Sequence, residues 1–247
     1  MSVSIVVIAE ADADRRTGCD LADRVFCDEI GWIEPSVLDA YREYRGVLGD
    51  RSLFTSWAAV ADEARRRRLR VHGHFDGSPG FPDAATTRNA LRLIDEVGNP
   101  ASALLLLRDE DGDPRRRDGI QQAMATVVPP YPVVIGFAIP KREAWVLAGF
   151  EARSDHENTL LARLAGELGF DPTRLPQDLR GGRKDPSPRN PKVMVERLCG
   201  NDEQRQQQCW TETPLPILRD RGRGCGLSEY LDELADLAGR VFKSANR

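Results

Sequence analysis

Apolar runs alternate with stretches of helical periodicity over the first 150 residues of the chain. Four runs rich in leucine or in β-branched residues predict strands. The runs are apolar on both faces, which is typical of a parallel sheet covered by helices on its two sides. The predicted strands cover residues 4–9, 69–75, 103–107 and 131–139.

Apolar residues three and four positions apart predict helices between these strands and after them. They indicate a helical insertion over about residues 15–68 and a helical C-terminal extension over residues 151–247. In the extension we expect Asp155 to cap a helix that ends at Gly169. The fold class is therefore α/β, with a mainly parallel sheet in a domain over residues 1–150 and the extension packed on it. Individual helices are predicted at 17–68, 84–97, 120–127, 142–150, 155–168 and 228–242.

The composition is that of a globular protein, with 247 residues, 40% of them hydrophobic and 30% charged. No apolar run reaches the roughly 18 to 20 residues of a membrane span. The first residues lack the basic stretch of a secretory signal, so we expect a cytoplasmic protein with no membrane segment. The five cysteines are an odd number without a CxxC pair, which predicts reduced thiols and argues against a disulfide framework or a structural zinc site.

The net charge of −4, from 35 basic and 39 acidic residues, argues on its face against a nucleic-acid-binding protein. Arginine makes up 31 of the basic residues, an excess that genomic base composition also produces. The distribution of charge is more informative than the total. Residues 180–197 carry six basic and two acidic side chains, and residues 115–117 are all arginine. A phosphate backbone could approach the chain at these two basic loops.

Acidic residues directly follow the first and third predicted strands. Ligands of open α/β sheets bind beyond the carboxyl ends of the strands, and residues two apart in an extended chain project to one side. Carboxylate oxygens at that spacing suit Mg²⁺. A solvated acidic turn explains one such cluster, whereas two clusters favour a cation site because crowded carboxylates need a neutralising charge. The first cluster is Glu10, Asp12 and Asp14, and the second is Asp109, Glu110, Asp111 and Asp113.

These acids resemble the motifs of the Toprim domain found in topoisomerases, primases and overcoming-lysogenization-defect nucleases. In that domain one strand ends in glutamate, with an acid four residues later, and a later apolar strand ends in Asp-x-Asp. Here the matching residues are Glu10 with Asp14 and Asp109 with Asp111. One departure is Ala11, since Toprim domains usually have glycine after the glutamate, and this puts close approach of a phosphate to that turn in doubt.

Two later segments extend the resemblance to small stand-alone Toprim-like proteins that are encoded beside ATPase genes in bacterial defence loci. They are IPKREAWVLAGF at 139–150 and KDPSPRNPKVMVERL at 184–198. The similarity covers most of the chain outside residues 15–68. It implies a Toprim-like Rossmannoid sheet, with a helical insertion after its first strand.

The resemblance implies hydrolysis of phosphodiester bonds that depends on Mg²⁺ or Mn²⁺. Glu10 would act as general acid/base or as a metal ligand, and Glu143 would complete the site. Lys192 would hold the scissile phosphate. The alternatives for the last two are a first-turn acid favoured by the helix dipole and an ordinary exposed lysine. The metal ligands implied by the resemblance are Glu10, Asp14, Asp109, Asp111 and Asp113.

The implied function is a nuclease, with DNA favoured over RNA, that serves as the effector of an anti-phage defence system together with an ATPase partner. No tyrosine stands in a context that singles it out as a strand-passing nucleophile, so topoisomerase activity is not expected. The sequence leaves a homo-oligomer open.

Two alternative functions remain beside this interpretation, and the role of one histidine pair stays open. Ala11 and the negative net charge favour a catalytically silent Toprim-like binding subunit. The LLLLRDEDGD segment also resembles the motif of haloacid-dehalogenase-like phosphatases, with Asp109 as nucleophile, although Asp113 stands where that family has threonine or valine. His72 and His74 would share one face of a strand, either as a metal pair or as a packed, hydrogen-bonded pair.

Overall fold

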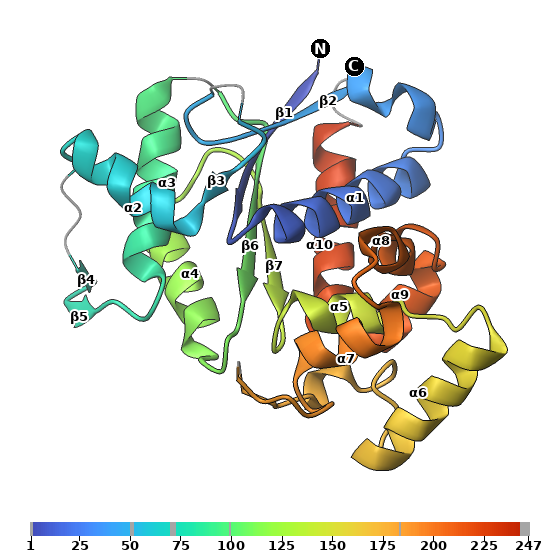
Figure 1. Cartoon of the computed structure of the whole chain (residues 1–247). Coiled ribbons are helices and arrows are strands. Elements are labelled where there is room, and N and C mark those ends of the chain that lie inside the picture. The colour runs from blue at the N-terminus through green and yellow to red at the C-terminus, as the bar shows by residue number, and fades with distance from the viewer. Residues whose placement is uncertain (1, 50–51, 70–72, 99, 183, 243–247) are drawn as a thin grey trace.

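The computed structural model describes residues 2–49, 52–69, 73–98, 100–182 and 184–242. A sheet runs through the middle of the described chain, and helices lie on both of its faces (Figure 1). The protein is therefore an α/β fold with a mainly parallel central sheet, as the sequence predicts.

Five strands form the main sheet: β1 (Val3–Ala9), β2 (Arg42–Arg45), β3 (Thr55–Ser56), β6 (Ala103–Asp109) and β7 (Val133–Ala138). Their order is β2-β1-β6-β7, and β3 pairs with the end of β1 beyond β2. All of these pairings are parallel. The carboxyl ends of β1, β6 and β7 consequently meet at one end of the sheet, where open α/β sheets bind their ligands.

Both faces of the sheet are buried. Successive side chains of a strand point to opposite faces, so Val7 and Leu105 join the apolar cluster on one side of the sheet. Val6 and Leu104 join the cluster on the other side. The strands of such a sheet are apolar at every position, which is why β1 and β6 stand out in the sequence.

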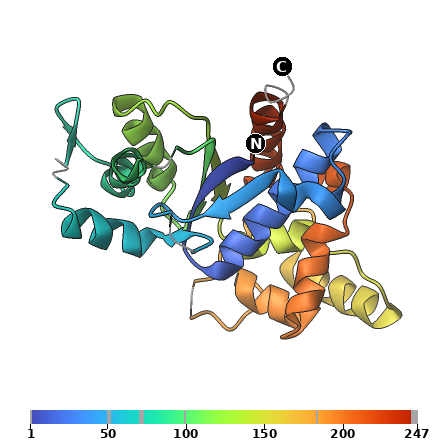
Figure 2. The ribbon, with the colours of Figure 1, turned by 90° about the horizontal axis from the view of Figure 1, so that it is seen from above.

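The helices form one layer on each face, which Figure 2 shows from above. The smaller layer consists of α2 (Trp57–Arg66), α3 (Ala84–Val97) and α4 (Arg115–Thr126). The larger layer consists of α1 (Asp12–Glu29), α5 (Arg142–Ala148), α6 (Asp155–Leu168), α7 (Pro191–Cys199), α8 (Glu203–Thr211), α9 (Leu215–Arg221) and α10 (Leu227–Val241). Two 3₁₀ helices, Pro35–Ala40 and Pro176–Asp178, lie in the connections.

Helix α1 approaches the sheet closely at Gly18. A Cβ atom at this position would lie 2.5 Å from Cδ1 of Leu107 in β6, so a larger residue would need a shift of its neighbours. The Tyr230 hydroxyl of α10 donates a hydrogen bond to the Gly18 carbonyl oxygen at 3.0 Å. Trp145 of α5 stacks on Tyr230, with ring centroids 5.1 Å apart. Trp145 is thus part of the core, and these contacts fix α1 and α5 on the same face.

Most predicted elements are confirmed. The strands expected at 4–9, 103–107 and 131–139 are β1, β6 and β7, and α3 has the predicted bounds. The cap of α6 is different: Ser154, and not Asp155, accepts the hydrogen bond from the Glu157 N–H, at 3.2 Å. None of the described helices has both the length and the apolar character needed to cross a bilayer.

Two predictions of local structure are wrong. The described part of the run at 69–75 contributes no strand to the main sheet: it holds only β4 (His74–Phe75), which pairs antiparallel with β5 (Ser78–Pro79) in a separate hairpin. Residues 70–72 lie outside the described residues. The insertion at 15–68 is not helical throughout, since it supplies β2 and β3. Strand β2, with the sequence REYR, lies at the edge of the sheet, where charged residues are common.

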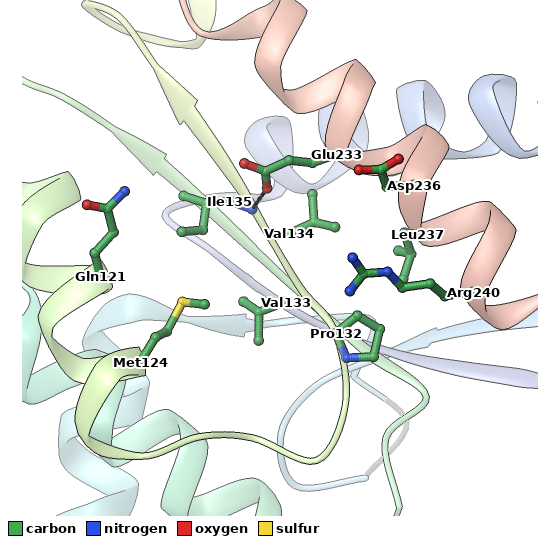
Figure 3. Close-up of a pocket in the computed structure, with 10 residues that line it drawn as sticks. All are labelled: Gln121, Met124, Pro132, Val133, Val134, Ile135, Glu233, Asp236, Leu237 and Arg240. Carbon is green, nitrogen blue, oxygen red and sulfur yellow. Dashed lines mark hydrogen bonds between the residues drawn. The ribbon is translucent and has the colours of Figure 1, made fainter.

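A groove of about 240 Å³ runs along the outer edge of β7, between α4 and α10 (Figure 3). Glu233 of α10 reaches this edge, and its Oε2 accepts a hydrogen bond from the Ile135 N–H at 2.8 Å. A carboxylate bound to an edge strand obstructs its pairing with a further strand. Burial raises the pKa of Glu233, although the Ile135 N–H opposes this, and the nearby carboxylate of Asp236 raises the pKa further.

The substitution Glu233→Gln tests this arrangement. The pKa of Glu233 is raised above its unfolded value of 4.5, so the folded protein holds the proton more tightly. The stability contributed by this group is complete below the unfolded pKa and is lost as the pH rises through the folded pKa. Glutamine keeps an acceptor for the Ile135 N–H and does not titrate. We expect the variant to melt at a higher temperature than the parent at neutral pH.

Thermal melts of both proteins between about pH 4 and about pH 8 measure this difference, which should shrink toward the acidic end. A difference in melting temperature that stays constant or grows on acidification would contradict the assignment.

Candidate functional site

The carboxyl ends of β1 and β6 place Glu10 beside Asp109. Ile8 of β1 pairs with Leu106 of β6, so the two strands leave the sheet at the same level. The Asp109 N–H donates a hydrogen bond to Glu10 Oε1 at 3.4 Å. The structure therefore brings together two acids that are 99 positions apart in the sequence.

The first turns of α1 and α5 bring two more carboxylates to this place. Asp14 Oδ2 accepts the Ala11 N–H at 2.9 Å, and Glu143 lies buried at the start of α5. Arg142 contacts three of these acids. Its main-chain N–H donates a hydrogen bond to Asp109 Oδ1 at 2.9 Å. Its guanidinium lies 3.7 Å from Asp14 and 3.8 Å from Glu143. We call the group formed by Glu10, Asp14, Asp109 and Glu143 the acidic centre.

Like charge is crowded at the acidic centre. Burial raises the pKa of Asp109, and the carboxylates of Asp14 and Glu143 add to it, so that it reaches about 8. Glu10 contributes in the same direction, and the Arg142 N–H opposes them. The pKa of Asp14 is also raised, chiefly by burial. Asp109 is thus a carboxyl group whose negative charge is not balanced by a neighbouring cation.

Asp111 lies at the side of the acidic centre, where it is held by the junction between β7 and α5. Its backbone is left-handed, with a φ of 52°. The Asp111 N–H donates to the Pro140 carbonyl oxygen at 3.1 Å, and Lys141 Nζ donates to Asp111 Oδ1. Burial alone would lower the pKa of Lys141, but its bond to Asp111 leaves that pKa raised. The lysine therefore stays charged and neutralises this carboxylate.

Two residues predicted for the site lie at or beyond its border. The sequence predicts that Asp109, Asp111 and Asp113 project to one side of an extended chain. The strand ends at Asp109, however, and a turn follows, so this geometry does not extend to Asp113. It pairs with Arg115 at 3.0 Å, and this bond lowers the pKa of Asp113. Lys192, in the first turn of α7, has Nζ 4.0 Å from Glu143 Oε1 and a side chain that is 62% exposed.

Sequence reasoning missed Arg108, which joins the acidic centre to the opposite face of the sheet. Its Nη1 donates to Glu10 Oε1, and its Nε donates to Asp83 Oδ2 at 2.7 Å. The guanidinium also lies over the ring of Trp57, 5.2 Å from its centroid. The sequence does contain a sign of this role. Arg108 ends an apolar strand directly before Asp109, and a charge in such a place needs a partner of opposite charge.

The acids have the right chemistry for Mg²⁺, but they are not arranged around one point. Carboxylate oxygens are the ligands that Mg²⁺ prefers. However, the described chain contains no group of three or more His, Cys, Asp or Glu side chains placed to hold a metal ion. Glu10 and Asp111 are bound instead by Arg108 and Lys141. A divalent cation could take these carboxylates only in exchange for the chain's own cations.

The remaining motifs add no second site. His72 lies outside the described residues, and His74 is exposed on β4, so the histidine pair is not placed. All five cysteines are free thiols, in agreement with the absence of CxxC spacing.

Comparisons with known proteins assign the chain to no family. No family model matches the chain, and neither a curated protein nor a solved structure matches it.

The double role of Arg108 predicts a measurable coupling. The side chains of Arg108 and Asp83 are both 13% exposed, and that of Glu10 is 28% exposed. Arg108→Met removes the partner that these carboxylates share and leaves Asp83 only Arg116, at 3.5 Å, so we expect a loss of about 2 kcal/mol of unfolding free energy. Adding Asp83→Asn should restore part of it, because asparagine carries no unpaired charge.

Urea denaturation of the parent, both single variants and the double variant gives the interaction energy. Strictly additive losses would show that Arg108 and Asp83 do not stabilise each other.

Proposed function

We propose that this protein is a metal-dependent hydrolase of phosphodiester bonds in nucleic acid, with a Toprim-like arrangement of its acids. The observation that carries the proposal is the gathering of carboxylates from β1, α1, β6 and α5 at the carboxyl end of a parallel sheet. That end of the sheet is where α/β folds bind ligands.

The residues divide into an acidic set and a cationic set. Asp109 and Asp14, with Asp111 once Lys141 has released it, would hold Mg²⁺ or Mn²⁺, and the metal would polarise the phosphate. Glu10 follows β1 directly and has 28% of its side chain exposed, so water can approach it, and it would serve as the general acid/base. Lys192, on the open side of Glu143, would bind the phosphate.

The basic segment over residues 180–197, a loop that leads into α7, supports nucleic acid as the partner. Its local charge is +4 in a chain whose net charge is −4. Arg180 and Lys192 are each 62% exposed there, so they are available to a phosphate backbone. The resemblance to stand-alone Toprim-like proteins extends the proposal to DNA as substrate, an ATPase partner and a role in anti-phage defence.

A second candidate is a catalytically silent Toprim-like binding subunit of an ATPase complex. The observation that favours it is the neutralisation of Glu10 by Arg108 and of Asp111 by Lys141. With these pairs in place, the described residues offer no ready metal site. Under this proposal the acids stabilise the fold and contribute nothing to hydrolysis.

Substitutions in the acidic centre distinguish the two candidates. Cleavage of labelled DNA and RNA is measured with Mg²⁺ and with Mn²⁺, for the parent and for Asp109→Asn and Glu10→Gln. We expect each variant to lose about 100-fold or more in rate, since loss of an acid–base group or of a metal ligand has effects of this size. Asp62→Asn, on the exposed surface of α2, serves as the control and should cleave like the parent.

Equal cleavage by the parent and both acidic-centre variants would overturn the hydrolase proposal. If purified protein binds Mn²⁺ in calorimetry, or copurifies with an ATPase, and yet cleaves no nucleic acid, the silent subunit is the better description.

A further inference from the structure

A cavity of about 240 Å³ opens beside the acidic centre, between the Asp111 turn and the loop that leads into α7. It is lined by Asp111 and Lys141 on the side of the acidic centre and by Arg180 and Gly182 on the side of the loop. Building on the proposed function, we infer that this cavity receives the base and sugar of one unpaired nucleotide. The substrate is then single-stranded nucleic acid.

The walls of the cavity suit a ring that has left a base stack. Pro140, Leu179 and Pro191 line the bottom of the cavity, where all three are buried, and they make that part of it apolar. Leu179 is completely buried, so it forms the floor and does not close the entrance. Base rings bind to such surfaces through their flat faces, which every base has, and binding of this kind tolerates different sequences.

The loop wall is fixed by a close backbone contact. The Gly181 N–H donates to the Arg189 carbonyl oxygen at 2.7 Å. A Cβ atom at Gly181 would lie 2.4 Å from the Asn190 nitrogen. The two backbone segments of the loop can approach this closely only because residue 181 is glycine. Gly182, one residue later, is open: an added Cβ would meet no atom within 4 Å. A side chain introduced at Gly182 would therefore occupy space that is now empty.

Charge at the cavity fits a nucleotide with its phosphate directed to the acidic centre. Asp111 and Lys141 belong to both the cavity and the edge of that centre. Arg180, whose guanidinium is 3.5 Å from Glu110, lines the opposite wall and is 62% exposed. A base and sugar inside the cavity would thus lie between Lys141 and Arg180, with their phosphate at the side of the acidic centre.

The size of the cavity selects unpaired nucleotides. Pockets for drug-sized molecules are about 300 to 1,000 Å³, so a cavity of about 240 Å³ holds a single base with its sugar. A base inside a duplex keeps both faces in the stack and its edge on its partner, and it enters a pocket only after unpairing at a cost of a few kcal/mol. A single strand avoids this cost.

Binding is tested without metal, so that no cleavage occurs. Fluorescence anisotropy in EDTA compares a labelled single-stranded DNA with a hairpin duplex of the same sequence. We expect the parent to bind the single strand about 10-fold more tightly or better. Gly182→Leu should weaken single-strand binding by about 10-fold and leave duplex binding nearly unchanged. Gly166→Leu is the matched control, because a Cβ at this exposed position of α6 also meets nothing within 4 Å.

Thermal melting shows whether each variant is folded. If folded Gly182→Leu binds the single strand as tightly as the parent, the cavity is not the nucleotide site. If the duplex binds as tightly as the single strand to the parent, the preference for unpaired nucleotides is wrong. Absence of cleavage in Mg²⁺ would overturn the proposed hydrolysis alone, because binding in EDTA does not depend on it.

Discussion

Repulsion between carboxylates at the carboxyl end of the sheet is the constraint to which the neighbouring structure responds. The parallel register of β1 and β6 places Glu10 and Asp109 next to each other. The first turns of two helices then add Asp14 and Glu143. Several buried or partly buried carboxylates in such a small volume are tolerated when positive charge lies nearby or when one of them is protonated, as the raised pKa of Asp109 favours.

The positive charge comes from residues that directly precede acids of the acidic centre in the sequence. Arg108 precedes Asp109 in β6, and Lys141 and Arg142 precede Glu143 at the start of α5. These cations pair with acids of neighbouring elements: Arg108 binds Glu10 after β1, and Lys141 binds Asp111 after β6. A bound metal and these cations would compete for the same carboxylates, so the affinity for a metal would depend on how readily Arg108 and Lys141 release their partners.

The sequence predicts the sheet well where burial on both faces makes a strand continuously apolar, as in β1, β6 and β7. It fails for β2, because REYR at the edge of a sheet has no apolar run and its pairing with β1 is a tertiary contact. The site shows the same division. Glu10 and Asp109 follow from their places after adjacent strands. The turn at Asp111 has a positive φ that aspartate rarely adopts, so extended geometry gave the wrong direction for Asp113.

Gly18 has a consequence for the electrostatics of a site that it does not touch. It stands one helical turn after Asp14, on the same face of α1, and the missing side chain lets the helix lie against Leu107. A methyl group there would require either the Leu107 side chain or this end of the helix to shift, and a shift of the helix would carry Asp14 away from Asp109. The density of negative charge that the protein presents to a cation is therefore set by an uncharged residue in the apolar layer behind it.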